Sequence, residues 1–254
     1  MRRFFTLFRH QVHMMMIAPS TYVAAFLFIV FMIFIYILGL LELSENATSS
    51  TPLEKFLSIF WVPVLFIVPL LTMRSLAEEK KTGTLDTLLT TPVSIFQVVL
   101  SKFLASYLYY SLLWALTLFF PLLTVISMPH ALADDRLFSL SQTLAGYSFI
   151  LASGLSYIAI GIFASSLTRT TLVAGMLSFC MLFCMIIGGG LIIKFSPPDT
   201  GWLSWMSGVA DYIQTFKQLE DFSSGVLDTR PFFFYGSVSI LLLAITTLVM
   251  DARR

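Results

Sequence analysis

The chain has 254 residues, of which 57% are hydrophobic and 11% are charged. An ordinary soluble domain has roughly 45–50% apolar and about 25% charged residues, so this composition excludes a disordered chain and argues against a soluble globule. The net charge of +1 provides no general attraction for nucleic acid. We therefore predict an all-α polytopic membrane protein, surrounded by lipid, with a single transmembrane domain over residues 1–254.

A basic leader precedes the first apolar segment, which we interpret as a retained span and not as a cleaved signal peptide. The leader carries His10, His13 and three consecutive methionines, and soft thioether ligands would suit Cu(I). Three consecutive residues cannot share one face of a helix. We therefore predict no metal site and interpret the leader as an amphipathic segment at the membrane surface.

Six apolar segments reach the length of roughly 20 residues that a helix needs to cross the hydrocarbon core. Pro63 and Pro69 lie inside the second segment and are expected to bend it. The third is longer than the bilayer requires, so it can tilt or extend beyond the lipid. The predicted spans, in chain order, are residues 22–41, 56–73, 95–126, 140–167, 172–193 and 232–250.

Charge predicts the orientation of these spans. An even number of spans places both termini on one side, where ten lysines and arginines would lie against five on the other. The side with more basic residues is normally cytoplasmic. We therefore expect an integral protein of the cytoplasmic (inner) membrane with both termini in the cytoplasm.

The connection over residues 74–94 is too long for a simple turn. Residues 74–81 are good helix formers and are expected to extend the second span. Gly83 can end that helix, Thr84 and Asp86 suit the first turn of a new one, and Pro92 ends it. Leu85, Leu88 and Leu89 fall at i, i+3 and i+4, which predicts a short amphipathic helix with one apolar stripe.

Two interpretations of this short helix stay open on physical grounds. It can rest among the lipid headgroups, or its leucines can fill a groove on a partner protein. In the second case the neighbouring charges would set the register of docking, namely Glu78, Glu79, Lys80 and Lys81.

The second long connection, residues 194–231, lies on the outer side in this topology. A short amphipathic helix is expected at its end, with Tyr212 and Phe216 on one face. Charged residues cluster nearby, namely Glu220, Asp221, Asp228 and Arg230. The simple interpretation is a solvated rim with an aromatic belt. The functional alternatives are an outer gate or a docking site for an extracytoplasmic accessory protein.

The predicted spans contain almost no charge. Lys102 lies about one turn inside the third span and is expected to reach back to the interface. Tyr107, Tyr109, Tyr110 and Trp114 are candidates for lining a transport pathway, although such residues more often pack helices together. A neutral, aromatic lining would suit an amphiphilic cargo better than an ion.

ATP hydrolysis by the chain itself is not expected. A P-loop has the pattern G-x-x-x-x-G-K-[ST], and no lysine here directly follows a glycine. No spacing of residues indicates a catalytic site, and no cofactor is expected on this chain.

Several motifs together resemble type-2 ATP-binding-cassette permeases, and more narrowly their gliding-motility-associated branch and its nitrous-oxide-reductase-maturation relatives. They are Glu78-Glu79-Lys80-Lys81-Thr82-Gly83-Thr84 with Leu88, Leu89 and Pro92, the segments 161–169 and 222–230, and the closing residues 251–254. The resemblance covers the whole chain in order. The segment 211–217 departs from the pattern because it lacks the histidine that family members often have there.

This resemblance implies a six-helix permease subunit that pairs with a second permease, either a copy of itself or a related chain. Each subunit would dock on a cytoplasmic ATPase that binds ATP and Mg²⁺, and residues 84–91 would be the coupling helix. The expected activity is export of an amphiphilic or polymeric substrate. A passive channel or scaffold is the first alternative, and an intramembrane enzyme is a second one that the lack of acids and histidines in the spans disfavours.

Overall fold

The computed structural model describes residues 2–45, 52–83, 94–127, 140–195, 214–223 and 228–252. Nearly all of these residues are helical, and no strand occurs among them. The helices are α1 (Arg2–Ile17), α2 (Pro19–Glu45), α3 (Pro52–Ser58), α4 (Trp61–Thr72), α5 (Ala77–Thr82), α7 (Ile95–Thr117), α8 (Phe119–Ser127), α9 (Leu140–Leu167), α10 (Thr171–Phe195), α12 (Thr215–Ser223) and α13 (Arg230–Asp251).

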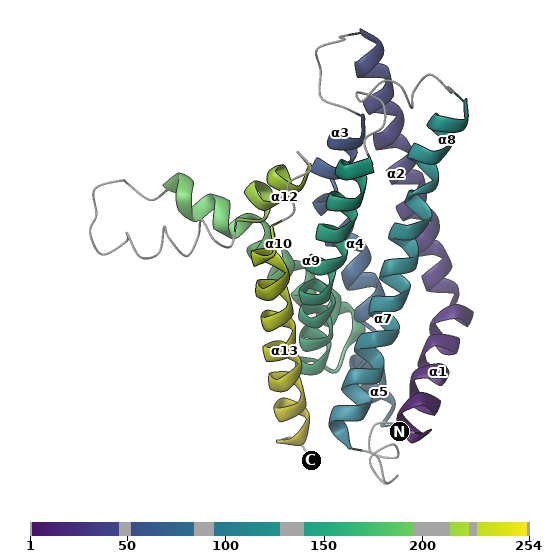
Figure 1. Cartoon of the computed structure of the whole chain (residues 1–254). Coiled ribbons are helices and arrows are strands. Elements are labelled where there is room, and N and C mark those ends of the chain that lie inside the picture. The colour runs from purple at the N-terminus through teal and green to yellow at the C-terminus, as the bar shows by residue number, and fades with distance from the viewer. Residues whose placement is uncertain are drawn as a thin grey trace.

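Within this part of the chain, six helical stretches are long and apolar enough to cross a membrane. They are Pro19–Glu42, Trp61–Thr82, Ile95–Leu123, Leu140–Leu167, Thr171–Leu191 and Arg230–Asp251. The predicted all-α, six-span fold is confirmed. The two chain ends lie at the same end of the bundle as α5, which we call the terminal end, and α3, α8 and α12 lie at the opposite end (Figure 1).

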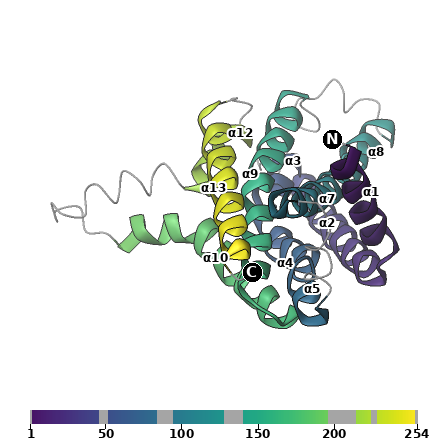
Figure 2. The ribbon, with the colours of Figure 1, turned by 90° about the horizontal axis from the view of Figure 1, so that it is seen from below.

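Helix α9 is the centre of the bundle. It packs against α4, α7, α10, α12 and α13, and it stands between α7 and α13 in the view from below (Figure 2). Of its most apolar window 78% is buried, a larger share than in any other candidate span of the described chain. Its many glycines, alanines and serines explain this position, because small residues let neighbouring helices approach closely.

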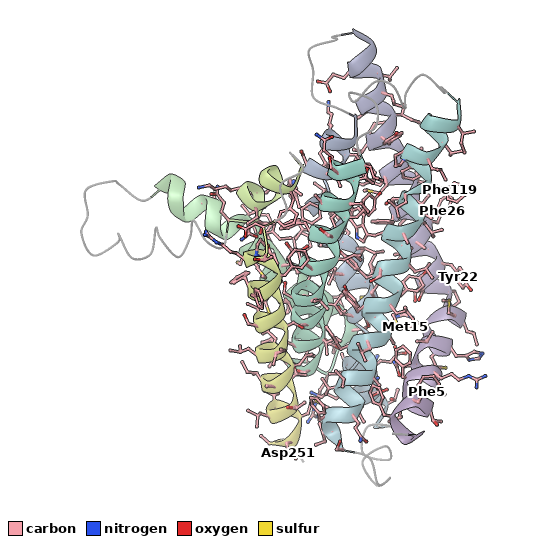
Figure 3. The ribbon with its side chains drawn as sticks, in the orientation of Figure 1. Phe5, Met15, Tyr22, Phe26, Phe119 and Asp251 are labelled. Carbon is pink, nitrogen blue, oxygen red and sulfur yellow. The ribbon has the colours of Figure 1, made fainter. Side chains whose placement is uncertain are left out.

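Aromatic rings fill the space between α9 and the other helices. Trp114 of α7 is fully buried and meets the rings of Phe28, Phe60 and Tyr147 at centroid distances of 5.3, 6.4 and 6.4 Å. The pairs with Phe28 and Tyr147 are edge-to-face, an arrangement that adds to the stabilisation that burial already provides. The opposite side of α2 and α8 is exposed, and Figure 3 shows Tyr22, Phe26 and Phe119 projecting there.

Two of the predicted spans are interrupted, the second where Pro63 was expected to bend it and the third without such an expectation, and a proline explains each interruption. A proline ring clashes with the carbonyl four residues earlier. For Pro63 that carbonyl belongs to Ile59, and the chain leaves the helix at residues 59–60 between α3 and α4. For Pro121 it belongs to Thr117, the residue at which α7 ends before α8 begins. Pro69, by contrast, is accommodated inside α4.

The leader also differs from the expectation of a segment lying at the membrane surface. Residues 2–17 form α1, which packs lengthwise beside α7. Met15 packs against the core. Pro19 is the first residue of α2, and the chain turns at Ala18 between the two helices.

Candidate functional site

The connection between the second and third spans begins with a segment that we call the elbow, residues 73–83. Helix α4 ends at Thr72, and residues 73–76 form a turn in which the Ser75 N–H donates to the Thr72 carbonyl at 3.0 Å. The elbow then continues as α5 and ends at Gly83. The predicted continuous helix over residues 74–81 is therefore wrong at its start and correct from Ala77 onward.

A serine from α9 explains the interruption. In a continuous helix the N–H groups of Leu76 and Ala77 would bond to carbonyls four residues earlier. Instead, both donate to Oγ of Ser165, each at 3.0 Å. The Ser165 hydroxyl itself donates to the Met73 carbonyl at 3.3 Å. One side chain thus caps the first turn of α5 from a different helix and occupies a carbonyl that the helix would otherwise use.

A buried ion pair joins the elbow to α7. Nζ of Lys102 lies 2.5 Å from Oε1 of Glu79 and donates to the Ser75 carbonyl at 2.7 Å. The Lys102 side chain is 2% exposed and that of Glu79 is 22% exposed. The prediction that Lys102 reaches out to the interface is therefore wrong. Its ammonium turns to the elbow, because a charge enclosed by helices needs a charged or carbonyl partner.

The four predicted charges of α5 divide between two faces. Glu79 and Lys80 face the bundle, and Nζ of Lys80 donates to the Ser166 carbonyl at the end of α9. Glu78 and Lys81 are exposed. At the start of the elbow, the Arg74 guanidinium donates to Oγ of Ser20 in α2 at 3.2 Å. The elbow is consequently tied to α2, α7 and α9 together.

Close packing of α4 on α9 brings the elbow near Ser165. A Cβ atom added to Gly161 of α9 would lie 2.2 Å from Oγ1 of Thr72. Only glycine allows this approach. Thr72 is the last residue of α4, and Ser165 lies one turn after Gly161 on α9. The contact between Thr72 and Gly161 therefore keeps the start of the elbow next to Ser165.

Gly83 ends α5 as predicted. Its φ of 71° lies in the left-handed region, which glycine occupies at the end of many helices. The predicted docking helix follows directly. Its residues lie outside the described part of the chain, namely Thr84, Leu85, Asp86, Leu88 and Leu89, together with Pro92.

The aromatic candidates for a transport pathway lie inside the bundle in this conformation. Tyr110 and Trp114 are fully buried, and Tyr109 is 8% exposed. The hydroxyls of Tyr107 and Tyr110 donate to the carbonyls of Leu151 and Ile150 in α9 at 3.0 and 3.3 Å. These residues act here in helix packing, and a role in lining a pathway stays a prediction.

The outer candidates are only partly brought together. Phe216 of α12 packs against the ring of Trp61 at a centroid distance of 5.8 Å. Asp228 lies beside Arg230, with Oδ2 at 3.9 Å from Nε. Tyr212 lies outside the described residues, as do the side chains of Glu220 and Asp221. The outer gate remains a prediction.

Sequence reasoning missed the parts that α7 and α9 contribute to the elbow. Ser165 and Ser166 lie in the resembling segment 161–169, but hydroxyls and carbonyls carry no signal that identifies a distant partner. Lys102 offered such a signal. A lysine within an apolar span has to find an acid, and Glu79 is an acid close to the end of the neighbouring span.

Comparison with known proteins agrees with this architecture. The family model of ABC-2 family transporter proteins matches residues 42–250, which covers most of the chain and all of the elbow. A search of curated proteins found no match. The six apolar helices and the family match together make the chain an integral membrane protein. The chain belongs to the ABC-2 family of transporter proteins, which are membrane permease subunits that partner with ATP-binding subunits and are not themselves P-loop ATPases.

Proposed function

We propose that this chain is the permease of an ATP-driven exporter in the cytoplasmic membrane, with both termini in the cytoplasm. A separate ATPase binds ATP and Mg²⁺ and grips residues 84–91 as a coupling helix. A second permease, identical or related, completes the pathway. The motifs quoted above favour the gliding-motility-associated branch of the family.

The observation that carries this proposal is the bonding of the elbow. A segment that only rested on the membrane would have no need for a buried ion pair and a cap from another helix. The elbow instead bonds to α7 through Lys102 and to α9 through Ser165, and it continues α4. A push on residues 84–91 would therefore move three spans as one body.

The cycle follows from this arrangement. ATP binding draws the two ATPase subunits together and displaces the coupling helix. The elbow passes the displacement to α4, α7 and α9, and the pathway opens to the outside. Because a ligand shifts an equilibrium only by its differential affinity for the two states, the ATP-bound ATPase pair has to bind the outward-open permease more tightly.

The composition of the spans favours an amphiphilic or polymeric cargo. Among the described residues, Lys102 is the only charged residue with a buried side chain, and it is engaged by Glu79 at the elbow. A carrier of ions or protons would be expected to hold further ionisable groups along its path.

Docking is tested by the variant Leu88→Asp in the full complex. A carboxylate on the apolar stripe should weaken association with the ATP-binding subunit and abolish ATP-driven transport, while membrane insertion is unchanged. Thr87→Asp, on the opposite side of the same predicted helix, is the matched control and should retain both properties. Co-purification of the ATPase at the wild-type ratio with Leu88→Asp would refute the docking role.

The passive-channel alternative makes a different prediction for reconstituted vesicles. If the chain is a channel or scaffold, transport will proceed without ATP and no ATPase will co-purify in stoichiometric amount. Transport that requires both ATP and the ATPase subunit would exclude this alternative.

A further inference from the structure

We propose that α1 and α7 form a binding site for an anionic phospholipid of the membrane leaflet at the terminal end of the bundle. The site is an open groove of about 750 Å³ that is lined mainly by α1, with Leu108 as the lining residue from α7. Phe8, Val12 and Leu108 contribute apolar surface to its lining, and Arg9, His10 and His13 contribute its nitrogen-bearing side chains. We call it the α1–α7 groove. This inference does not depend on coupling to ATP.

The two kinds of lining match the two parts of a phospholipid. Apolar side chains of α1 and Leu108 of α7 offer a surface for an acyl chain, and most of the groove's surface is apolar. Arg9 and His13 are one helical turn apart on α1, so their side chains lie next to each other. A guanidinium binds a phosphate through two parallel N–H donors, and an imidazole adds another donor.

The charge of the groove favours an anionic lipid over a zwitterionic one. Neither α1 nor α7 contains an acidic residue, and the first acid of the whole chain is Glu42, near the far end of α2. Arg9 is exposed and has no ion pair with any acid in the described part of the chain. Its charge is therefore left for a ligand of negative net charge.

The depth of the groove also fits a lipid. Helix α1 runs beside the half of α7 that lies at the terminal end (Figure 1). Along it, Phe5 lies nearer the end of the bundle and Met15 nearer to Tyr22 of α2 (Figure 3). The basic residues stand between these two positions, so a headgroup bound at Arg9 would leave its acyl chains parallel to α7 and directed toward the membrane centre.

The test is a lipid titration of the full-length protein in neutral detergent, followed by native mass spectrometry with phosphatidylglycerol or phosphatidylcholine as the probe. The wild type should bind phosphatidylglycerol more tightly, and added salt should reduce the difference. Arg9→Gln should weaken phosphatidylglycerol binding by about fivefold, which corresponds to about 1 kcal/mol for a basic residue at a membrane surface. Its binding of phosphatidylcholine should fall by a smaller factor, because the choline ammonium cancels the net charge of that phosphate.

Two further variants keep the result interpretable. Arg169→Gln removes an exposed arginine at the same end of the bundle but outside the groove, and it should bind both lipids like the wild type. Leu108→Trp fills the groove at a position that is 45% exposed, so the fold tolerates it, and it should weaken binding of both lipids.

Three results would overturn the proposal. Arg9→Gln could leave phosphatidylglycerol binding unchanged, or it could lower it no more than Arg169→Gln does. Alternatively, Leu108→Trp could leave lipid binding intact and dissociate a dimer, which would assign the groove to a second copy of the chain.

Discussion

Ser165 shows how much a single hydroxyl can decide in this protein. It accepts two N–H groups of the elbow and donates to the Met73 carbonyl, so it replaces the bonds that a continuous helix would have made itself. The adjacent Ser166 is also buried, but its hydroxyl bonds within α9 to the Phe163 carbonyl at 2.7 Å. The two serines therefore allow a direct comparison.

Ser165→Ala should lower the free energy of unfolding by about 1–2 kcal/mol, because two buried N–H groups lose their acceptor at the start of a helix. Ser166→Ala should change it by less, since the carbonyl that receives Lys80 is retained. Equilibrium unfolding in mixed micelles measures both. Equal losses would show that Ser165 acts only as a small residue in the helix packing.

The Glu79–Lys102 pair predicts a non-additive result. Glu79→Gln should cost about 3 kcal/mol, the lower end for a broken buried pair because Glu79 is 22% exposed. Adding Lys102→Met removes the unpaired ammonium and should restore most of the stability.

Unfolding of the two single variants and the double variant measures this coupling, and the exposed Glu78→Gln serves as the control. If the pair also transmits movement as proposed, the double variant will be stable and yet defective in ATP-driven transport. Additive losses of stability would contradict the pairing itself.

At the scale of elements, prolines interrupt helices and glycines bring them together. The interruptions before α4 and α8 follow from Pro63 and Pro121. Three glycines of α9 face side chains of three other helices. Added Cβ atoms would lie 2.4 Å from Leu57 for Gly146, 2.3 Å from Tyr110 for Gly154 and 2.2 Å from Thr72 for Gly161. Three positions of α9, each about two turns from the next, therefore serve as contact points for α3, α7 and α4.

Gly161→Ala should destabilise the protein by about 1–3 kcal/mol, because the new methyl group overlaps a fully buried threonine that cannot move away. Gly188→Ala in α10 is the matched control. Nothing lies within 4 Å of its added Cβ, so alanine should be neutral or slightly stabilising there. Thermal unfolding in detergent compares the two, and similar behaviour would show that α4 and α9 are not closely packed at this point.

At the scale of the whole molecule, both chain ends and α5 lie at one end of a bundle of six candidate spans (Figure 1). This arrangement agrees with an even number of crossings. Which end faces the cytoplasm depends on the distribution of basic residues.

Orientation is tested with single cysteines in a background where Cys180 and Cys184 are replaced by serine. Lys81→Cys in α5 and Lys217→Cys in α12 are both exposed and lie at opposite ends of the bundle. In intact cells a membrane-impermeant maleimide should label Lys217→Cys at once and Lys81→Cys only after permeabilisation. The reverse pattern would place the elbow outside and contradict docking to a cytoplasmic ATPase.

The local sequence determined the all-α class, the six spans and the end of α5 at Gly83. The length of an apolar segment, its lack of charged residues and the conformational freedom of a glycine are all local properties of the chain. The proline interruptions were also within reach of local rules. Only the packing of the helices decided that Lys102 turns to Glu79, that Ser165 caps α5, that Trp114 is enclosed by rings and that α1 lies beside α7. These contacts join residues far apart in sequence, and an ammonium, a hydroxyl or an indole ring accepts many partners until neighbouring helices leave only one within reach.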